Sequence, residues 1–222
     1  WVRQCGHRHF RADLDSVAGS NHDLARHFTL NLEGNVEHSD QLWDAAYTRD
    51  GKIILSASFD GTAMAWNAED GAPIAQYVGH SRAVFCVAAS PDSQYAFTGS
   101  RDYDVKKWDL TTGQELLTFS GHEGTVRALV STGGDKLISC SHDKTIRVWD
   151  SNTGSCQQVF SGHERTVTCL ALLSEARLVS GSWDGSIRVW DLGTGALQAT
   201  VSDLPPVMAL AASQDRKSTR LN

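Results

Sequence analysis

The sequence predicts an all-β fold, a partial propeller ring of four complete blades plus two partial blades. A pattern of Ser or Thr, an Asp four residues later and a Trp six residues after the Asp occurs four times, and its Trp residues lie 41 or 42 residues apart. A histidine precedes each Trp by 27 or 28 residues. The stretches between them are short β-branched and aromatic runs separated by Gly, Asp, Asn and Ser. Repetition of strand-like units at this period is typical of propeller blades.

The first unit along the chain, residues 1–35, is expected to form only a degenerate, partial blade. Residues 16–30 align with the last strands of the fourth complete unit. Ala18, His22 and Phe28 stand where that unit has Ser, Asp and Trp. We therefore expect this region to lack the repeated polar residues of the complete blades.

Four complete units follow, within a repeat domain at residues 36–212. The third is the clearest, with strands predicted at 125–131, 136–141 and 145–149, and a fourth stretch at 115–119 ahead of its Gly-His pair. Asp-Gly dipeptides in the first and fourth units favour tight hairpins, because Gly and Asp tolerate a positive φ. Apolar residues occupy both alternations of the strands, which predicts sheets that are covered on both faces.

The chain ends in a further partial blade and a tail. Asp203 takes the position of the repeated histidine, and residues 206–212 repeat the strand that follows it. Residues 215–222 resemble the translation of a sequencing-adapter oligonucleotide. We therefore expect residues 213–222 to be an artefactual, disordered tail; a genuine basic tail is the alternative.

The repeated pattern resembles that of the WD40-repeat β-propeller family. Gly-His and Trp-Asp pairs frame the second, third and fourth complete units in full. The first complete unit has Glu37 in place of the Gly and Asn67 in place of the Asp. The resemblance covers about residues 36–212. Since rings of this family most often close with seven blades, it implies that these units form an arc of a larger ring; a closed ring of five blades is the alternative. It also implies a hydrogen-bonded tetrad of His, Ser or Thr, Asp and Trp in each blade: His38-Ser56-Asp60-Trp66, His80-Thr98-Asp102-Trp108, His122-Ser139-Asp143-Trp149 and His163-Ser180-Asp184-Trp190.

Ser, His and Asp are also the residues of a hydrolase triad, so a catalytic alternative has to be weighed. An enzyme needs one activated nucleophile in one pocket, whereas a fold needs the same buried clamp in every blade. Four equivalent copies therefore indicate a structural role, and we predict no catalytic residue and no enzyme activity in this chain. No phosphate-binding glycine loop or nucleophile elbow is found in the sequence.

Composition restricts the partners. With 41% hydrophobic and 21% charged residues the chain resembles an ordinary globular domain, and its net charge of −6 disfavours binding to nucleic acid through phosphates. No apolar run is long enough to span a membrane. Cysteines within strand runs favour reduced thiols, so we expect an intracellular protein of the cytoplasm or nucleus. A group of possible metal ligands lacks a recognised zinc spacing, so no metal or cofactor is predicted: Cys5, His7, His9, His22 and His27.

The resemblance implies a noncatalytic scaffold or adaptor that binds proteins or peptides on the top face of the propeller. One alternative is the substrate-recognition subunit of a ubiquitin ligase. Another is the sensor propeller of a larger multidomain enzyme. The family's docking mark for one ligase class, an Arg three residues after the tetrad Trp, is absent at the four places: Glu69, Thr111, Asn152 and Gly193.

The resemblance also implies where a partner would bind. In the family, the residue before the tetrad Asp and the residues three and five after the tetrad His project beside the central channel. Of those positions, the aromatic and basic ones form the expected partner-binding set: Trp43, Phe59, Phe85, Arg101, Arg127, His142 and Trp183. Aromatic residues and Arg are enriched at interface hot spots. The arginines favour an acidic or phosphorylated peptide as the partner.

Overall fold

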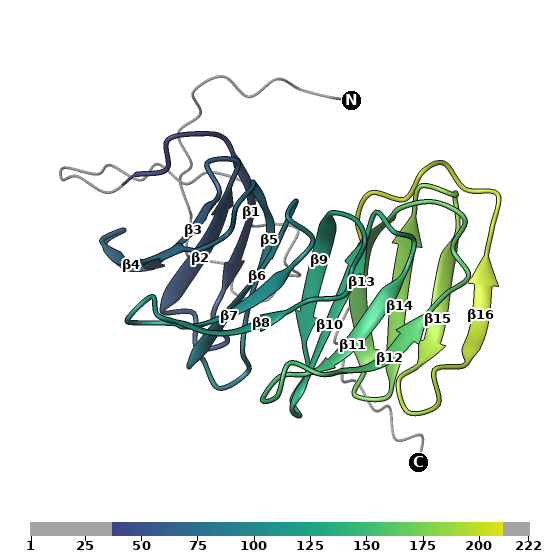
Figure 1. Cartoon of the computed structure of the whole chain (residues 1–222). Helices are drawn as coiled ribbons and strands as arrows, with labels where there is room; N and C mark the ends of the chain where they lie inside the picture. Colours follow the sequence, from purple (N-terminus) through teal and green to yellow (C-terminus); the bar gives the residue numbers. More distant parts are fainter. Residues whose placement is uncertain (1–36, 211–222) are drawn as a thin grey trace, which may run out of the picture.

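The structure, a computed structural model, describes residues 37–210 (Figure 1). Within this range every regular element is a strand, so the all-β prediction is confirmed, and no helix capable of crossing a membrane is found there. The strands form four antiparallel sheets of four strands each. They are β1 (Leu42–Tyr47), β2 (Ile53–Ser58), β3 (Thr62–Asn67), β4 (Pro73–Val78), β5 (Val84–Ala89), β6 (Tyr95–Ser100), β7 (Val105–Asp109), β8 (Glu115–Phe119), β9 (Val126–Ser131), β10 (Lys136–Ser141), β11 (Ile146–Asp150), β12 (Cys156–Phe160), β13 (Val167–Ser174), β14 (Arg177–Ser182), β15 (Ile187–Asp191) and β16 (Leu197–Val201).

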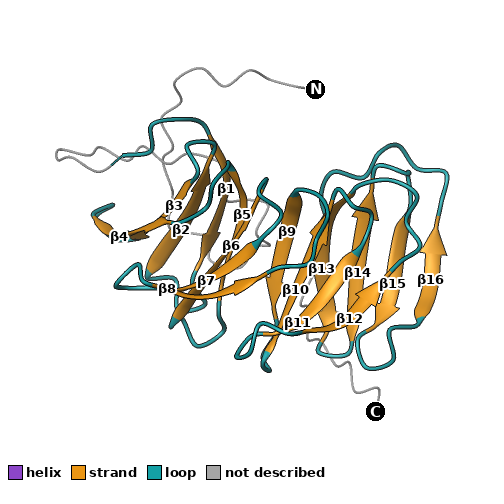
Figure 2. Ribbon diagram, in the orientation of Figure 1, coloured by secondary structure: helices purple, strands orange, loops and turns teal. Residues whose placement is uncertain are grey.

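Each sheet is a meander of consecutive strands joined by short loops (Figure 2). We number the sheets as blades 1 to 4: β1–β4, β5–β8, β9–β12 and β13–β16. The first strands of successive blades contact one another, β1 with β5, β5 with β9 and β9 with β13. The blades therefore stack side by side around their first strands, as the blades of a propeller do, and the ring is not closed.

The fourth strand of a sheet comes from the sequence unit that follows the other three strands. Residues 115–119 were expected with the third unit, but β8 pairs with β7 and completes blade 2. A tight turn explains this pairing, because the Asp109 N–H donates to the Gln114 carbonyl at 2.9 Å and the Asp109 carboxylate accepts the Thr112 N–H at 2.8 Å. A turn this short returns the chain antiparallel to the strand it has left. Each sequence unit is thus offset by one strand from its blade.

Between the blades, the tetrad Trp of blades 2, 3 and 4 packs on the blade before it. Trp149 of blade 3 is 1% exposed and lies in one apolar cluster with Phe97 and Phe119 of blade 2. The Phe119 and Trp149 rings meet edge to face with centroids 5.9 Å apart. Trp108 and Trp190 belong to the corresponding clusters on either side. Sheets covered on both faces were expected from the apolar residues on both strand alternations, and this packing confirms it for blades 2 and 3.

The described chain ends on the last blade. Residues 206–210, where a strand was expected, contain no strand, although the Val207 N–H donates to the Ser182 carbonyl at 3.0 Å. The Val207 carbonyl accepts the Thr168 hydroxyl at 2.5 Å. The expected degenerate blade at residues 1–35, the metal-like cluster and the tail at residues 213–222 lie outside the described residues, as do residues 211–212 of the expected last strand.

Candidate functional site

The four residues of each predicted tetrad come from two strands and two loops: the Ser or Thr and the Trp lie on the second and third strands, and the His and the Asp lie in the loops before the first strand and after the second. In blade 3, the Trp149 indole N–H donates to the Ser139 hydroxyl at 2.8 Å, and His122 Nε2 lies 2.7 Å from that hydroxyl. His122 Nδ1 lies 2.6 Å from the Asp143 carboxylate. Since the Ser139 hydroxyl accepts from the indole, it can donate its own hydrogen bond to Nε2. Nδ1 then carries the ring proton and donates a hydrogen bond to Asp143.

The other three tetrads have the same connections. The His-to-Asp distances are 3.0, 2.8 and 2.9 Å in blades 1, 2 and 4, and the indole-to-hydroxyl distance is 2.8 Å in each. The first tetrad is included, although Glu37 and Asn67 replace the usual Gly and Asp beside it. The internal hydrogen bonds therefore do not depend on those flanking residues.

These hydrogen bonds set the charge of the tetrad carboxylates. Burial raises the pKa of Asp102, but the hydrogen bond and charge of His80 and the Ser81 N–H outweigh burial and bring this pKa down to about 2. The remaining tetrad carboxylates show the same direction, with hydrogen bonds lowering each pKa against burial: Asp60, Asp143 and Asp184. The tetrads thus contain ionised carboxylates at neutral pH.

Two of the tetrad histidines, His38 and His163, respond to burial in the opposite way, because their charged form is a cation. Burial lowers the pKa of His38 and of His163, although the neighbouring Asp acts to raise each of them. The hydroxyls that would have to act as nucleophiles are enclosed, since Ser139 and Ser180 are 0% exposed. A substrate has no access to such a hydroxyl, and it already accepts a hydrogen bond from Trp.

A fifth residue belongs to three of the four tetrads, and the sequence pattern missed it. A hydroxyl two residues after the Asp donates to the second carboxylate oxygen at 2.6 to 2.7 Å: Thr62, Thr145 and Ser186. Blade 2 has Asp104 at this place, and only its backbone N–H reaches Asp102, at 3.1 Å. The signal was present in the sequence as a repeated Asp-x-Thr or Asp-x-Ser.

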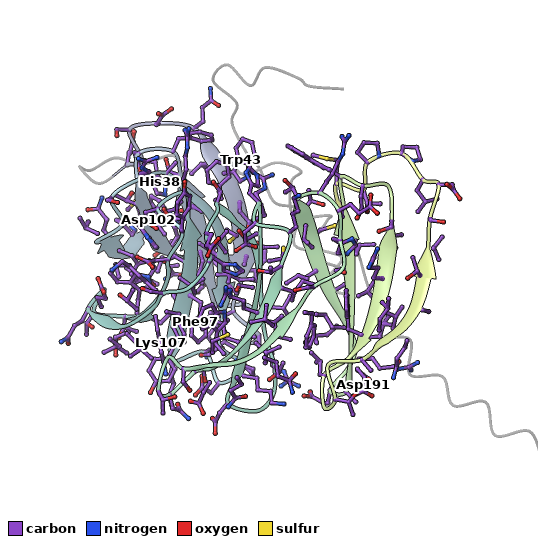
Figure 3. All side chains as sticks on the ribbon, turned by 45° about the vertical axis from the view of Figure 1, so that its right-hand side comes forward. His38, Trp43, Phe97, Asp102, Lys107 and Asp191 are labelled. Atoms are coloured by element: carbon purple, nitrogen blue, oxygen red, sulfur yellow. The ribbon has the colours of Figure 1, made fainter. Side chains whose placement is uncertain are left out.

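The second predicted set converges on the face formed by the loops before the first strands and between the second and third strands. Figure 3 shows Trp43 and His38 at this end of the blades, with Lys107 and Asp191 towards the other end. An open hollow of about 460 Å³ lies there. Six of the seven predicted residues line it: Trp43, Phe85, Arg101, Arg127, His142 and Trp183.

The seventh residue, Phe59, supports the wall of the hollow. The rings of Trp43, Phe59 and Phe85 contact one another with centroids 5.0 to 5.2 Å apart. Trp43 is 46% exposed but Phe85 only 8%, so Phe85 lies beneath the surface instead of projecting from it as expected. The Arg127 guanidinium covers the Trp43 and Phe85 rings at 5.2 and 5.0 Å from their centroids. These stacked rings form a preformed wall.

Four more residues line the hollow: Thr125, which is three residues after the tetrad His122 and so at a position of the predicted face, and three that the sequence reasoning did not select, Arg82, Tyr103 and Met208. Met208 lies five residues after Asp203, which stands at the position of the tetrad His. Trp43 in blade 1 and Phe85 in blade 2 lie at the equivalent place, so extending the pattern by one unit would have found Met208. Tyr103 has a positive φ of 81°. A bulky residue rarely adopts this conformation, which is often associated with a functional surface.

The sequence matches the family described as WD domain, G-beta repeat, at residues 30–67, 71–109, 113–150 and 154–191. It is 31% identical over 101 residues to Eukaryotic translation initiation factor 3 subunit I of Neurospora crassa, across 46% of this chain and 29% of that protein. It is 32% identical over 79 residues to the Homo sapiens protein of the same name, across 36% of this chain and 24% of that protein. The chain thus spans less than a third of the length of these relatives.

Proposed function

The chain belongs to the WD40-repeat family, and from that premise we propose that it is a noncatalytic scaffold that binds protein or peptide partners on its top face. One observation carries the proposal: residues from all four blades that are far apart in the sequence meet in a single hollow. Trp43 and Trp183 remain 46% and 39% exposed at its edges. Large exposed aromatic residues around a basic centre are typical of interface hot spots.

The buried tetrads support a binding function over a catalytic one. Each tetrad hydroxyl accepts the indole N–H of its own blade, and Ser139 and Ser180 are fully buried. The exposed polar groups of the hollow are cationic or neutral. Such groups can hold an acidic or phosphorylated segment of a partner.

The relatives favour a scaffold within an assembly. Their printed name identifies each of them as a subunit of a translation initiation factor. We therefore propose that this chain, too, works as one component of a larger complex. The similarity covers 101 and 79 residues and supports this type of role.

Partner capture tests the proposal. The 222-residue chain would be used as bait in a cell extract, with quantitative mass spectrometry of the bound proteins, beside a double variant with Arg101→Ala and Trp183→Ala. We expect this double variant to lose the specific partners while its melting temperature is retained. A control variant with Arg49→Ala and Val159→Ala, exposed residues away from the hollow, should keep them. Retention of every partner by the double variant would exclude the top face as the binding site.

A further inference from the structure

The residues around the hollow change in chemical character from one blade to the next. The positions five residues after the tetrad His, continued onto Asp203, hold Trp43, Phe85, Arg127, Thr168 and Met208. The positions before the tetrad Asp hold Phe59, Arg101, His142 and Trp183. Along the arc the hollow is thus aromatic at blade 1, basic at blades 2 and 3, and apolar again at blade 4.

The aromatic end is rigid before any ligand arrives. Each of Trp43, Phe59 and Phe85 contacts the other two, and the Arg127 side chain packs on two of the three rings. Trp43 has the largest exposed surface of the three and borders the hollow. An apolar side chain placed against it would bury aromatic surface with little loss of side-chain freedom, because these rings are already fixed.

The basic centre has an excess of positive charge. Ten residues line the hollow, and they include Arg82, Arg101, Arg127 and His142 but no Asp or Glu. This is unusual for a chain with a net charge of −6. Burial lowers the pKa of Arg127, and its Nε atom is buried without a hydrogen-bond partner. Arg82 and Arg101 are exposed on the same surface, where their guanidinium groups are free to turn towards an anion.

The apolar end is formed by blade 4 and the segment that follows it. The Trp183 indole N–H donates to the Met208 sulfur at 3.1 Å, and the Trp183 ring lies 5.8 Å from that of His142. Met208 is 60% exposed. A flexible thioether beside an indole can adapt to apolar side chains of different shapes. This end therefore offers a second apolar contact, on the far side of the arginines from Trp43.

Building on the proposed function, we infer that the hollow binds a phosphorylated peptide whose phosphorylated residue is flanked on both sides by apolar residues. A phosphate carries close to two negative charges and three acceptor oxygens, which several cations can share, whereas one carboxylate is satisfied by a single bidentate Arg. In an extended peptide, side chains two residues apart point the same way. We therefore expect the apolar residues two positions before and after the phosphorylated one.

Binding of synthetic peptides to the full chain, followed by fluorescence anisotropy, tests this inference. The probe is a labelled 11-residue peptide of Gly, Ser and Asn with phosphoserine at its centre and Leu two positions away on each side. Three matched peptides replace the phosphoserine with Ser, replace it with Glu, or replace both Leu with Ser. We expect the first peptide to bind about tenfold more tightly than each of the other three.

Protein variants assign the two kinds of contact. Arg101→Ala should reduce the preference for phosphate and keep that for Leu, whereas Trp183→Ala should weaken the preference for Leu and keep that for phosphate. Arg49→Ala, which removes one exposed positive charge from the turn between β1 and β2, should change neither. A thermal melt of each variant verifies that it is folded.

Two outcomes would overturn the inference: equal binding of the phosphorylated, Glu and Ser peptides, or binding of none of them. A phosphate preference that survives the combined change of Arg82→Ala and Arg101→Ala would also exclude the basic centre as its origin. The proposed function is tested separately, because partner capture asks only whether proteins need this face and not whether they are phosphorylated. Partners lost in the double variant, with no phosphate preference in the peptides, would retain the scaffold and reject the phosphorylated ligand.

Discussion

The tetrads and the top-face hollow differ in how their residues vary from blade to blade: residue types are constant in the tetrads and variable around the hollow. The tetrads have the same residue types in every blade, apart from Thr98 for Ser, and the same hydrogen bonds. The residues just before the tetrad Asp differ completely between blades: Phe59, Arg101, His142 and Trp183. A buried position must satisfy the same neighbours in each blade, whereas a position beside the channel can vary with the partner. Uniformity therefore marks the fold, and variation at equivalent exposed positions marks recognition.

Among the changes that test this comparison, removal of a tetrad carboxylate should have the largest effect on the free energy of unfolding. Asp143 accepts four hydrogen bonds, from His122 Nδ1, the Glu123 N–H, and the N–H and hydroxyl of Thr145. Asp143→Ala leaves these donors unpaired in a mostly buried site. We expect a loss of about 3 kcal/mol or more in the free energy of unfolding, measured by urea denaturation.

Glu123→Ala is the matched control, because it removes an exposed carboxylate one residue from His122 and keeps the backbone N–H that Asp143 accepts. This change should stay within about 0.5 kcal/mol. A similar small effect for Asp143→Ala would mean that the tetrad does not stabilise the blade.

Acidification should break the tetrads in two steps. The pKa of His38 and His163 is lower in the folded chain, so below the unfolded value of 6.5 the unfolded chain binds more protons and stability falls. The tetrad Asp residues also have lowered pKa values, about 2 for Asp102, so their contribution is present above the unfolded value of 3.8 and is lost as the pH falls towards 2. Melting temperatures from pH 7.5 to 3 at constant ionic strength should show both declines. A melting temperature that rises between pH 7 and 5.5 would contradict the histidine assignment.

Much of the fold could be predicted because its strongest signals repeat. Four copies of one pattern in register were enough to indicate the sheets, since a strand pattern that is ambiguous once is unlikely to recur by chance four times at one period. The sequence unit was read to begin before its histidine, as the family repeats at residues 71–109 and 113–150 also do, but the first strand of the unit completes the preceding sheet. The short turn from Asp109 to Gln114 forces β8 back onto β7, and the length of this loop was readable in the sequence.

The hollow was harder to predict in detail, because exposure depends on neighbours that a repeat pattern does not contain. Phe85 was placed at the right position, but it is buried by Trp43, Phe59 and Arg127, which come from other strands and loops. Met208 was missed because its unit has Asp203 in place of the histidine. Equivalent positions in the repeat thus predict which residues lie around the hollow, but the packing of neighbouring side chains determines which of them are accessible.

Completion of the one incomplete tetrad should give a smaller effect of the opposite sign. Asp104→Thr removes a carboxylate near Asp102 and supplies the hydroxyl that Thr145 provides to Asp143 at 2.7 Å. We expect a gain of about 1 kcal/mol in the free energy of unfolding. Asp104→Ala is the control that removes the charge without adding the hydroxyl. If both variants have the same stability, the fifth residue contributes nothing to the tetrad.

The smallest effect on stability is expected at the top face. If its residues serve recognition and not the fold, a substitution there should weaken partner binding and leave the free energy of unfolding nearly unchanged. Trp183 is 39% exposed, and its ring contacts the exposed residues His142 and Met208. Trp183→Ala should therefore change the free energy of unfolding by about 0.5 kcal/mol at most, while binding of partners to the hollow falls. Trp190→Ala is the matched contrast, because this Trp is 3% exposed and donates to Ser180, so its loss should cost about 3 kcal/mol or more. A comparable loss of stability in both variants would show that the top-face aromatic residues belong to the packing of the blades, and the separation of the two roles would fail.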